Sequence, residues 1–218
     1  MTMKFLITIT APSCSGKTYL LDYLENSKKF QKIPTYTTRP QRSGEIDGDD
    51  YHFTNEAEIR AIQGAALGGF IELNYFNGYY YGMPKGYFDY IMDNTNDKIP
   101  VIICTPEGVK VYEDYCHRNN IQLIKAYLYT DETVRLERLM YRTYIDSQAM
   151  SESTPPSEIA KRAITAGINR CRDMYIKENL WFGMNKWDLI LVGDDKPRNN
   201  EVLINRKIKL VEERVLSL

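Results

Sequence analysis

The feature that most constrains the fold is a phosphate-loop pattern that directly follows a short apolar stretch. Residues 4–10, KFLITIT, are apolar and β-branched, which predicts a buried β-strand. Residues 11–18, APSCSGKT, match G-x-x-x-x-G-K-[ST] except that Ala11 stands where glycine is usual. Leucines at helical spacing follow, so we expect a helix to open at about Gly16. Because the strand and the helix flank the pattern correctly, a chance match on a surface turn is the weaker interpretation.

A glycine-bearing turn between a strand and a helix directs backbone N–H groups into a concavity that binds phosphate oxygens. Lys17 would reach the outer phosphates of a nucleoside triphosphate, and the Thr18 hydroxyl would hold Mg²⁺. The predicted ligands of the triphosphate are Ser13, Cys14, Ser15, Gly16, Lys17 and Thr18. The methyl group of Ala11 would disturb this loop only if position 11 required a positive φ.

The remaining apolar segments predict an α/β fold with a parallel sheet. Further strands are expected at residues 100–104, 121–129 and 187–192, and helices at 131–144, 158–177 and 200–216. Strands separated by helices indicate βαβ units. The Pro- and Gly-rich residues 34–90 are interpreted as a small α+β lobe inserted into a three-layer core formed by 1–33 and 91–218.

The composition excludes several classes of protein. Of the 218 residues, 43% are hydrophobic and 26% are charged, which is typical of a globular chain, and the net charge is −1. Such a charge attracts neither nucleic acid nor an anionic membrane, so any anion site must be local. The four cysteines have no zinc or CxxC spacing, which favours free thiols in a reducing cytoplasm.

The stretch from 35 to 53, TYTTRPQRSGEIDGDDYHF, carries a second candidate phosphate site. Arg39 and Arg42 lie three residues apart and are stiffened by Pro40, so together they can form a fork for one phosphate group. Tyr51 can add a hydroxyl donor. An exposed charged turn would explain the two arginines alone, but not their occurrence in the same chain as a phosphate loop.

This stretch resembles guanylate kinases, which carry S-x-T-T-R-x-x-R-x-G-E-x-x-G-x-D-Y-x-F after their phosphate loop. Later segments are also similar to that family: Phe70-Ile71-Glu72, then residues 78–82 (GYYYG), and a helix with Arg138 and Arg142. Arg162 matches a Lys-Arg helix, and residues 187–195 resemble the family's terminal strand. The resemblance therefore covers about residues 4 to 195 in the family's order.

The resemblance implies a nucleoside monophosphate kinase that uses Mg²⁺ with ATP and acts on GMP or dGMP. It assigns the acceptor's phosphate to Arg39, Arg42, Tyr51 and Tyr81, and the guanine ring to Glu72 and Thr35. The chemistry of Glu72 agrees, because one carboxylate can accept from both N1–H and the N2 amine of guanine. Adenine lacks that pair of donors, so it would leave the carboxylate desolvated and unpaired. A solvated charge is the alternative interpretation of Glu72.

The resemblance also implies a helical lid at about 138–165 whose arginines close on the transferring phosphoryl group. Arg138 and Arg142 are four residues apart, on one helical face, and Arg162 would act with them and with Lys17 in catalysis. For Arg135, a solvated basic face is an equally good interpretation. The resemblance further implies a cytoplasmic monomer or homodimer.

Several positions depart from the family pattern. Residues 103–108 (ICTPEG) stand where the family has D-x-D-x-Q-G, so Ile103 and Thr105 replace acids, and Thr35 stands for the usual serine. Met83 replaces a small hydroxyl residue, and Gly193 replaces an asparagine associated with the donor adenine. These changes bear on the base preference and on the metal geometry rather than on the phosphate ligands.

Two alternatives to guanylate phosphorylation stay open. A non-catalytic guanylate-kinase-like binding module would be free to lose Lys17, Thr18 and the lid arginines, all of which are present. A kinase of another phosphorylated acceptor, such as another deoxynucleotide or a ribosyl phosphate, would fit the changes at Met83 and Thr105 but would not need Glu72.

Overall fold

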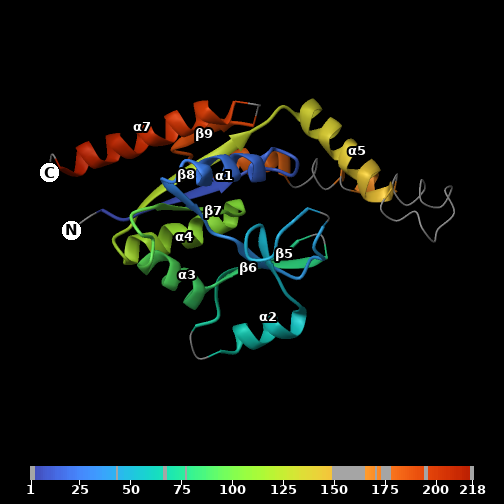
Figure 1. Cartoon of the computed structure of the whole chain (residues 1–218), viewed down its shortest axis with the longest axis horizontal. Coiled ribbons are helices and arrows are strands. Elements are labelled where there is room, and N and C mark those ends of the chain that lie inside the picture. The colour runs from blue at the N-terminus through green and yellow to red at the C-terminus, as the bar shows by residue number, and fades with distance from the viewer. Residues whose placement is uncertain are drawn as a thin grey trace.

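The computed structural model describes residues 3–42, 44–65, 68–76, 78–148, 165–169, 171–172, 178–193 and 196–216. Its core is a five-stranded sheet in the order β2-β7-β1-β8-β9 (Figure 1). The strands are β1 (Phe5–Thr10), β2 (Phe30–Lys32), β7 (Ile99–Ile103), β8 (Gln122–Tyr129) and β9 (Leu189–Val192). Every neighbouring pair runs parallel, which confirms the predicted α/β fold with a parallel core.

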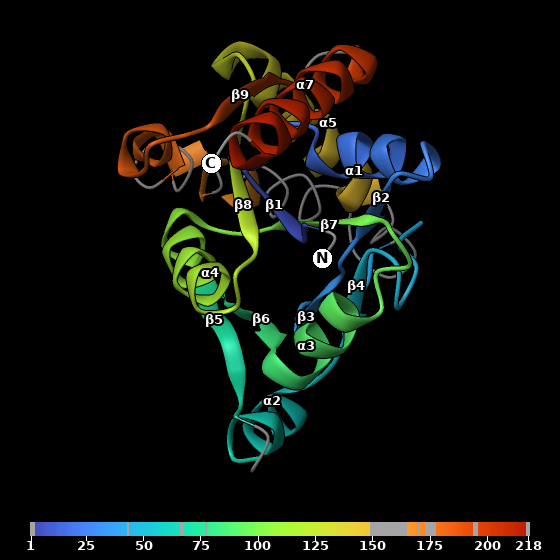
Figure 2. The same cartoon turned by 90° about the vertical axis from the view of Figure 1, so that its left-hand side faces the viewer.

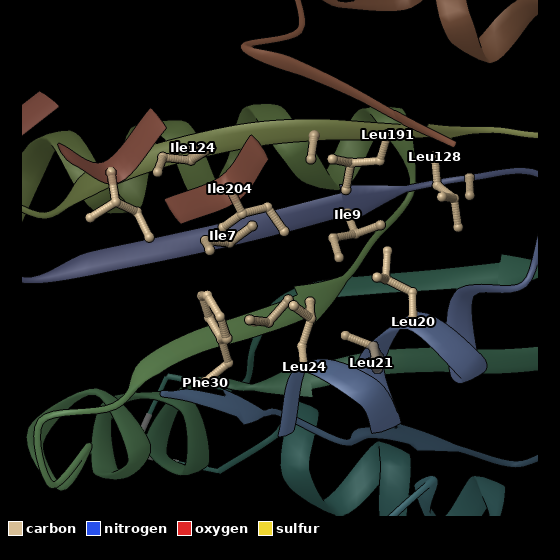
Figure 3. Packing of buried hydrophobic residues seen from close by; sticks show 14 of the residues in the cluster. Ile7, Ile9, Leu20, Leu21, Leu24, Phe30, Ile124, Leu128, Leu191 and Ile204 are labelled. Carbon is tan, nitrogen blue, oxygen red and sulfur yellow. The ribbon is translucent and has the colours of Figure 1, made fainter. Parts of the chain in front are cut away.

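Helices cover both faces of this sheet and complete three layers. The helices α1 (Lys17–Asn26) and α7 (Pro197–Leu216) lie on one face, and α3 (Lys85–Asp93) and α4 (Pro106–Arg118) lie on the other (Figures 1 and 2). Because side chains alternate along a strand, Ile7 and Ile9 pack toward α1 and α7, whereas Leu6 packs toward α3 and α4 (Figure 3). The apolar run at residues 5–10 is therefore continuous because both faces of β1 are buried.

A second, four-stranded sheet is built from the chain between β2 and α3. Its order is β4-β3-β6-β5. The strands are β3 (Thr35–Thr37), β4 (Tyr51–Phe53), β5 (Phe70–Phe76) and β6 (Tyr79–Pro84), with the helix α2 (Glu56–Gln63) between β4 and β5. In Figure 1 this second sheet lies below the core sheet, and α2 lies farther from the core sheet than the labelled strands β5 and β6 do. The Asn55 side chain accepts from the Glu58 amide at 3.0 Å and caps α2.

A buried lysine joins the two sheets at the edge strand β2. Lys32 Nζ lies 3.0 Å from Asp22 Oδ1 and 3.8 Å from Glu25 Oε2, both on α1. It also lies 2.9 Å from Asp49 Oδ2, in the turn before β4. Burial opposes the charge of Lys32, but Asp49 and Asp22 outweigh burial and raise its pKa above the ordinary value. The lysine therefore stays charged and links the start of the second sheet to α1.

Three elements follow the second half of the core. The helix α5 (Glu132–Gln148) extends beyond the predicted 131–144, and a 3₁₀ segment, η1 (Glu178–Met184), precedes β9. Of the helix expected at 158–177, residues 165–169 and 171–172 are helical and the others lie outside the described residues. Within the described part of the chain, no helix is both long enough and apolar enough to cross a bilayer.

Candidate nucleotide-binding site

The loop between β1 and α1 has the backbone shape that its sequence predicts. Gly16 adopts a left-handed conformation with φ 87° and is the N-cap of α1, so the helix N-terminus opens directly on the loop. Cys14 is also left-handed, with φ 63°. Ala11 is not among the described residues with positive φ, and its methyl group is buried in the core cluster. The replacement of glycine at position 11 therefore introduces no backbone strain.

Lys17 is folded back onto the loop. Its Nζ donates to the Ala11 carbonyl at 2.9 Å and to the Pro12 carbonyl at 2.8 Å. Burial is the main reason that the pKa of Lys17 falls to about 8; Arg142 and Arg135 also act to lower it, whereas Glu178 and Cys14 act to raise it. At neutral pH most of the lysine is still protonated. An anion in the loop would favour that charge and would compete with the two carbonyls for the ammonium group.

A glutamate from far along the chain occupies one side of the same loop. Glu178 Oε2 accepts from the Ser13 amide at 2.7 Å, and Oε1 accepts from Ser13 Oγ at 2.7 Å. Arg135 NH2 lies 3.3 Å from Glu178 Oε2, and its Nε donates to the Ser13 carbonyl at 3.2 Å. Both charged side chains are buried, with exposed fractions of 1% for Glu178 and 4% for Arg135. The solvated interpretation of Arg135 is therefore wrong, because this arginine holds the loop to α5.

The other arginines of α5 lie against the loop as well. Arg138 NH1 donates to the Cys14 carbonyl and to the Gly193 carbonyl, each at 3.3 Å. Arg142 is exposed, yet it is near enough to Lys17 to lower the pKa of that lysine. Arg162 lies outside the described residues. The described part of the lid region therefore directs positive charge toward the phosphate loop.

Two further loop residues differ in how they can meet a ligand. Ser15 is fully buried, and its backbone amide donates to the Pro12 carbonyl at 3.4 Å, so a ligand could reach this residue only after the loop rearranged. Thr18 is exposed in the first turn of α1, and its hydroxyl is accessible. Among the described residues, no group of three or more His, Cys, Asp or Glu side chains could hold a metal ion. A magnesium ion bound at Thr18 would also be coordinated by phosphate oxygens and water, as is usual for Mg²⁺.

Gly193 explains one departure from the family pattern. A Cβ at this position would overlap Thr130 Oγ1 and the Ser15 carbonyl oxygen. The Gly193 amide donates to the Tyr129 carbonyl at the end of β8 at 2.7 Å, and Arg138 NH1 donates to both the Gly193 and the Cys14 carbonyl, which holds the turn after β9 close to the phosphate loop. This turn passes too close to the loop for an asparagine, so glycine is required here.

The predicted acceptor-phosphate residues gather on the second sheet. Arg39 is buried and forms two hydrogen bonds with Glu45, at 3.0 Å and 2.8 Å, while Arg42 NH1 lies 3.8 Å from Glu45 Oε1. The Arg39 guanidinium lies 5.3 Å from the centre of the Tyr51 ring, and the Tyr51 and Tyr81 rings are 6.1 Å apart. Burial opposes the charge of Glu45, but the two arginines outweigh burial and keep the pKa of Glu45 below its ordinary value.

Strand order explains why these residues meet. β3, which leads into Arg39, lies between β4 and β6 in the sheet, so Tyr51 on β4 and Tyr81 on β6 flank it. Thr37 pairs with Tyr81, and Thr35 pairs with Tyr51. The structure therefore brings the two arginines and two tyrosines into one cluster, as the sequence predicted.

Glu72 is buried, with an exposed fraction of 9%, which excludes the solvated interpretation. Its Oε1 accepts from Asn74 Nδ2 at 2.6 Å and from Thr105 Oγ1 at 3.2 Å. The carboxylate lies so close to Gly108, in the first turn of α4, that a Cβ there would be 2.7 Å from Oε2 and would overlap Oε1. Burial raises the pKa of Glu72 to about 7, although the hydrogen bonds from Thr105 and Asn74 oppose that rise.

Thr35, which was expected near the base, and Met83, which replaces a family hydroxyl residue, are placed differently from Glu72. Thr35 is half-buried on β3, and it is not one of the side chains that donate to Glu72 Oε1. Met83 stands opposite Glu72 across the β5–β6 pair and is fully buried in the cluster that contains Phe88 and Ile102. Met83 therefore packs into the core that supports Glu72.

Three polar residues of the site were not predicted from the sequence. Asn74 follows Glu72 by two positions on one strand, so period-two alternation could have placed it on the same face. Glu45 follows Arg42 by three positions within the turn that carries the arginines, which is a weaker signal. Glu178 lies 165 residues from Ser13, and nothing in the local sequence connects them.

Comparisons with known proteins agree with this site. Residues 3–111 match the family model for guanylate kinase. The chain is 43% identical to guanylate kinase of Aromatoleum aromaticum over 81 residues, which cover 37% of this chain and only 39% of that protein. It is 25% identical to guanylate kinase of Chlamydia felis over 210 residues, covering 95% of this chain and 88% of that protein.

The crystal structure of guanylate kinase from Anaplasma phagocytophilum has the same fold, with a TM-score of 0.58 and 14% identity, over 96% of this chain and 87% of that chain. The family model spans the phosphate loop, the arginine fork, Glu72 and Thr105. Because the family model matches half of the chain, the chain belongs to the guanylate kinase family.

Proposed function

We propose that this chain transfers the γ-phosphoryl group of ATP, bound with Mg²⁺, to GMP or dGMP. The observation that carries the proposal is the register of the second sheet. Tyr81, in the phosphate cluster, pairs directly with Asn74, which stands two residues from Glu72 on the same face of β5. A ligand with a phosphate at one end and two adjacent N–H donors at the other would match that face.

Each group has a distinct role in the proposed reaction. Arg39 and Arg42 would exchange Glu45 for the acceptor's phosphate, and Tyr51 and Tyr81 would donate to it. Glu72 would accept from N1–H and the N2 amine of guanine, with Thr35 as a further proposed base contact. The residues proposed for the donor are Ser13, Cys14, Ser15, Gly16, Lys17 and Thr18.

Phosphoryl transfer depends on positioning and on positive charge at the transferring oxygens. Lys17, Arg138 and Arg142 would supply that charge from the loop and from α5, and Arg162 from the remainder of the lid. A bound magnesium ion would neutralise phosphate charge, with Thr18 as a protein ligand. The proposed lid lies at about 138–165, within the proposed core formed by 1–33 and 91–218. Its closure over the proposed lobe at 34–90 would exclude water from the reacting nucleotides.

The test is an ADP-release assay with ATP, Mg²⁺ and each of GMP, dGMP, AMP, CMP, UMP and dTMP. We expect turnover with the guanine nucleotides only. Glu72→Gln should lower kcat/KM for GMP tenfold or more, because a charged hydrogen bond contributes about 1.5–3 kcal/mol. The matched control is Glu56→Gln on α2, where the carboxylate is exposed and pairs with Arg60.

No turnover with any acceptor would refute the proposal. Turnover with AMP equal to that with GMP would refute the role of Glu72. If calorimetry also found no binding of Mg²⁺·ATP, the result would favour a non-catalytic binding module. The predicted cytoplasmic location stays a prediction.

A further inference from the structure

The Glu72 carboxylate, which is proposed to bind guanine, accepts hydrogen bonds from two neighbouring side chains, Asn74 and Thr105. Glu72 and Asn74 alternate with Leu73 on β5, so their side chains lie on the same face of that strand, and β5 lies beside α4 (Figure 2). Asn74 Nδ2 lies 2.6 Å from Glu72 Oε1 and 3.3 Å from Thr105 Oγ1. Thr105 Oγ1 in turn accepts from the Gly108 amide at 3.2 Å as the N-cap of α4. One amide group thus connects the carboxylate of the second sheet to the first turn of a core helix.

We propose that Asn74 is the positioning residue for Glu72: its amide fixes the orientation of the carboxylate and stabilises its ionised form, so that Asn74 determines the strength and the pH range of guanine binding. This inference rests on the proposed function, because it gives Glu72 the base-binding role. Asn74 acts through Glu72 and need not touch the nucleotide.

The geometry supports a role in orientation. Asn74 and Thr105 both donate to the same oxygen, Oε1, and each oxygen of an ionised carboxylate has two acceptor positions. With both acceptor positions of Oε1 occupied, the two positions of Oε2 are left for the N1–H and the N2 amine of the base, and the bonds at Oε1 fix their direction. Without Asn74, the carboxylate would lose its shortest hydrogen bond and keep the longer, 3.2 Å bond from Thr105 and the interaction with Tyr112, so it could rotate more easily about its terminal torsion.

The surroundings also explain why Asn74 should affect ionisation. The titratable groups that face Glu72 are Tyr112 on α4 and Cys104 at the end of β7, and burial together with the charge of Glu72 raises the pKa of both. Both are therefore neutral at neutral pH and provide no positive charge. The ionised form of Glu72 depends on hydrogen bonds and on the α4 N-terminus, and Asn74 makes the shortest of those bonds.

The charge state matters because it changes which base is complementary. An ionised carboxylate accepts two hydrogen bonds and fits the N1–H and N2 amine of guanine. A protonated carboxyl donates one and accepts one, which fits the N1 acceptor and N6 amine of adenine. Loss of Asn74 should consequently weaken GMP binding most at low pH and reduce the selectivity for GMP over AMP.

The experiment compares wild type, Asn74→Ala, Glu72→Gln and the double variant, with Asn94→Ala as control. Asn94 is exposed at the C-cap of α3, and its Nδ2 donates to the Tyr90 carbonyl at 2.7 Å, so the control also removes one amide hydrogen bond. GMP affinity and kcat/KM are measured from pH 6 to pH 9. A loss of one charged hydrogen bond predicts an affinity about tenfold lower at pH 7.

For Asn74→Ala, we expect the midpoint of the GMP-binding pH profile to move upward by about one pH unit, with partial recovery at pH 9. In the Glu72→Gln background, Asn74→Ala should cost less than twofold, because a positioning residue has no effect once its partner is changed. Asn94→Ala should behave as wild type. An unchanged midpoint, or an equal loss in both backgrounds, would overturn the inference.

A second measurement does not depend on any substrate. The carboxyl stretch of Glu72 is followed by infrared titration of the ligand-free protein, with the Glu72→Gln spectrum subtracted. The titration of Asn74→Ala should be displaced to higher pH than that of wild type, and identical titrations would overturn the inference. If wild type neither binds nor phosphorylates GMP, the proposed function fails, but the infrared result still decides whether Asn74 controls Glu72.

Discussion

The close approach of Glu72 to α4 allows a sharp test through a single methyl group. In Gly108→Ala, the added Cβ would overlap Glu72 Oε1 and lie 2.7 Å from Oε2, so the carboxylate must move away from the helix. That movement breaks the hydrogen bonds from Asn74 and Thr105, at 2.6 Å and 3.2 Å. The backbone of Gly108 is helical, and it is not among the residues with positive φ, so alanine itself is not strained there.

The magnitude follows from two opposing effects. Loss of hydrogen bonds to a charged group costs about 1.5–3 kcal/mol. Replacement of glycine by alanine in a helix stabilises by about 1 kcal/mol. We therefore expect Gly108→Ala to lower the free energy of unfolding by about 0.5–2 kcal/mol, which corresponds to a Tm lower by about 1–8 °C. The affinity for GMP should fall tenfold or more, whereas ATP binding at the phosphate loop should not change.

The matched control is Gly86→Ala in α3, where an added Cβ meets no atom within 4 Å. The control should raise Tm by about 2–4 °C and leave GMP binding intact. Thermal unfolding by circular dichroism and calorimetric titration with GMP check both variants. If Gly108→Ala were as stable as Gly86→Ala and bound GMP normally, the reasoning that Glu72 is held against α4 in the base site would be refuted.

Three further predictions follow from other contacts. The pKa of Glu72 is about 7 in the folded protein against an ordinary value of 4.5, so the free energy of unfolding should fall by about 3 kcal/mol between pH 4.5 and pH 7. Urea unfolding at each pH measures this decrease, and Glu72→Gln should abolish it. Gly193→Ala should weaken ATP binding tenfold or more in calorimetry, since its methyl group would push on the Ser15 carbonyl; wild-type affinity would contradict the close approach. Glu178→Gln should lower the free energy of unfolding by about 3 kcal/mol, because it leaves the buried Arg135 without its counter-charge. The double variant Arg135→Met with Glu178→Leu should restore most of that free energy in the same urea measurement.

Much of the core was predictable because its signals are local. The run at residues 4–10 gave β1, since a strand buried on both faces must be apolar throughout. The Gly16-Lys17-Thr18 turn gave the start of α1, and Asn55 gave the cap of α2. Edge strand β2 was not predicted, because three residues, Phe30–Lys32, are too few to establish a period.

The site was predictable where one motif held its residues. The arginines and tyrosines of the acceptor cluster were found because the turn after β3 and the strands beside it lie within one segment. The contact between Glu178 and Ser13 depends on how η1 packs against the loop, which is a tertiary effect with no local pattern. The surroundings of Glu72 likewise depend on the contact of β5 with α4, so the sequence singled out Glu72 and Thr105 but neither their contact nor Asn74.

The pairing of Glu45 with Arg39 and Arg42 has a consequence for what the acceptor site can admit. The Glu45 carboxylate already offsets one of the two positive charges, so a ligand of the proposed acceptor site must displace a monoanion that is tethered in place. A phosphate dianion brings more charge and more acceptor oxygens than the carboxylate it would replace, whereas chloride or a nucleoside without phosphate does not. The displaced glutamate would then be free to reorient the turn that carries it, so that arrival of the correct ligand is coupled to movement of residues 39–45.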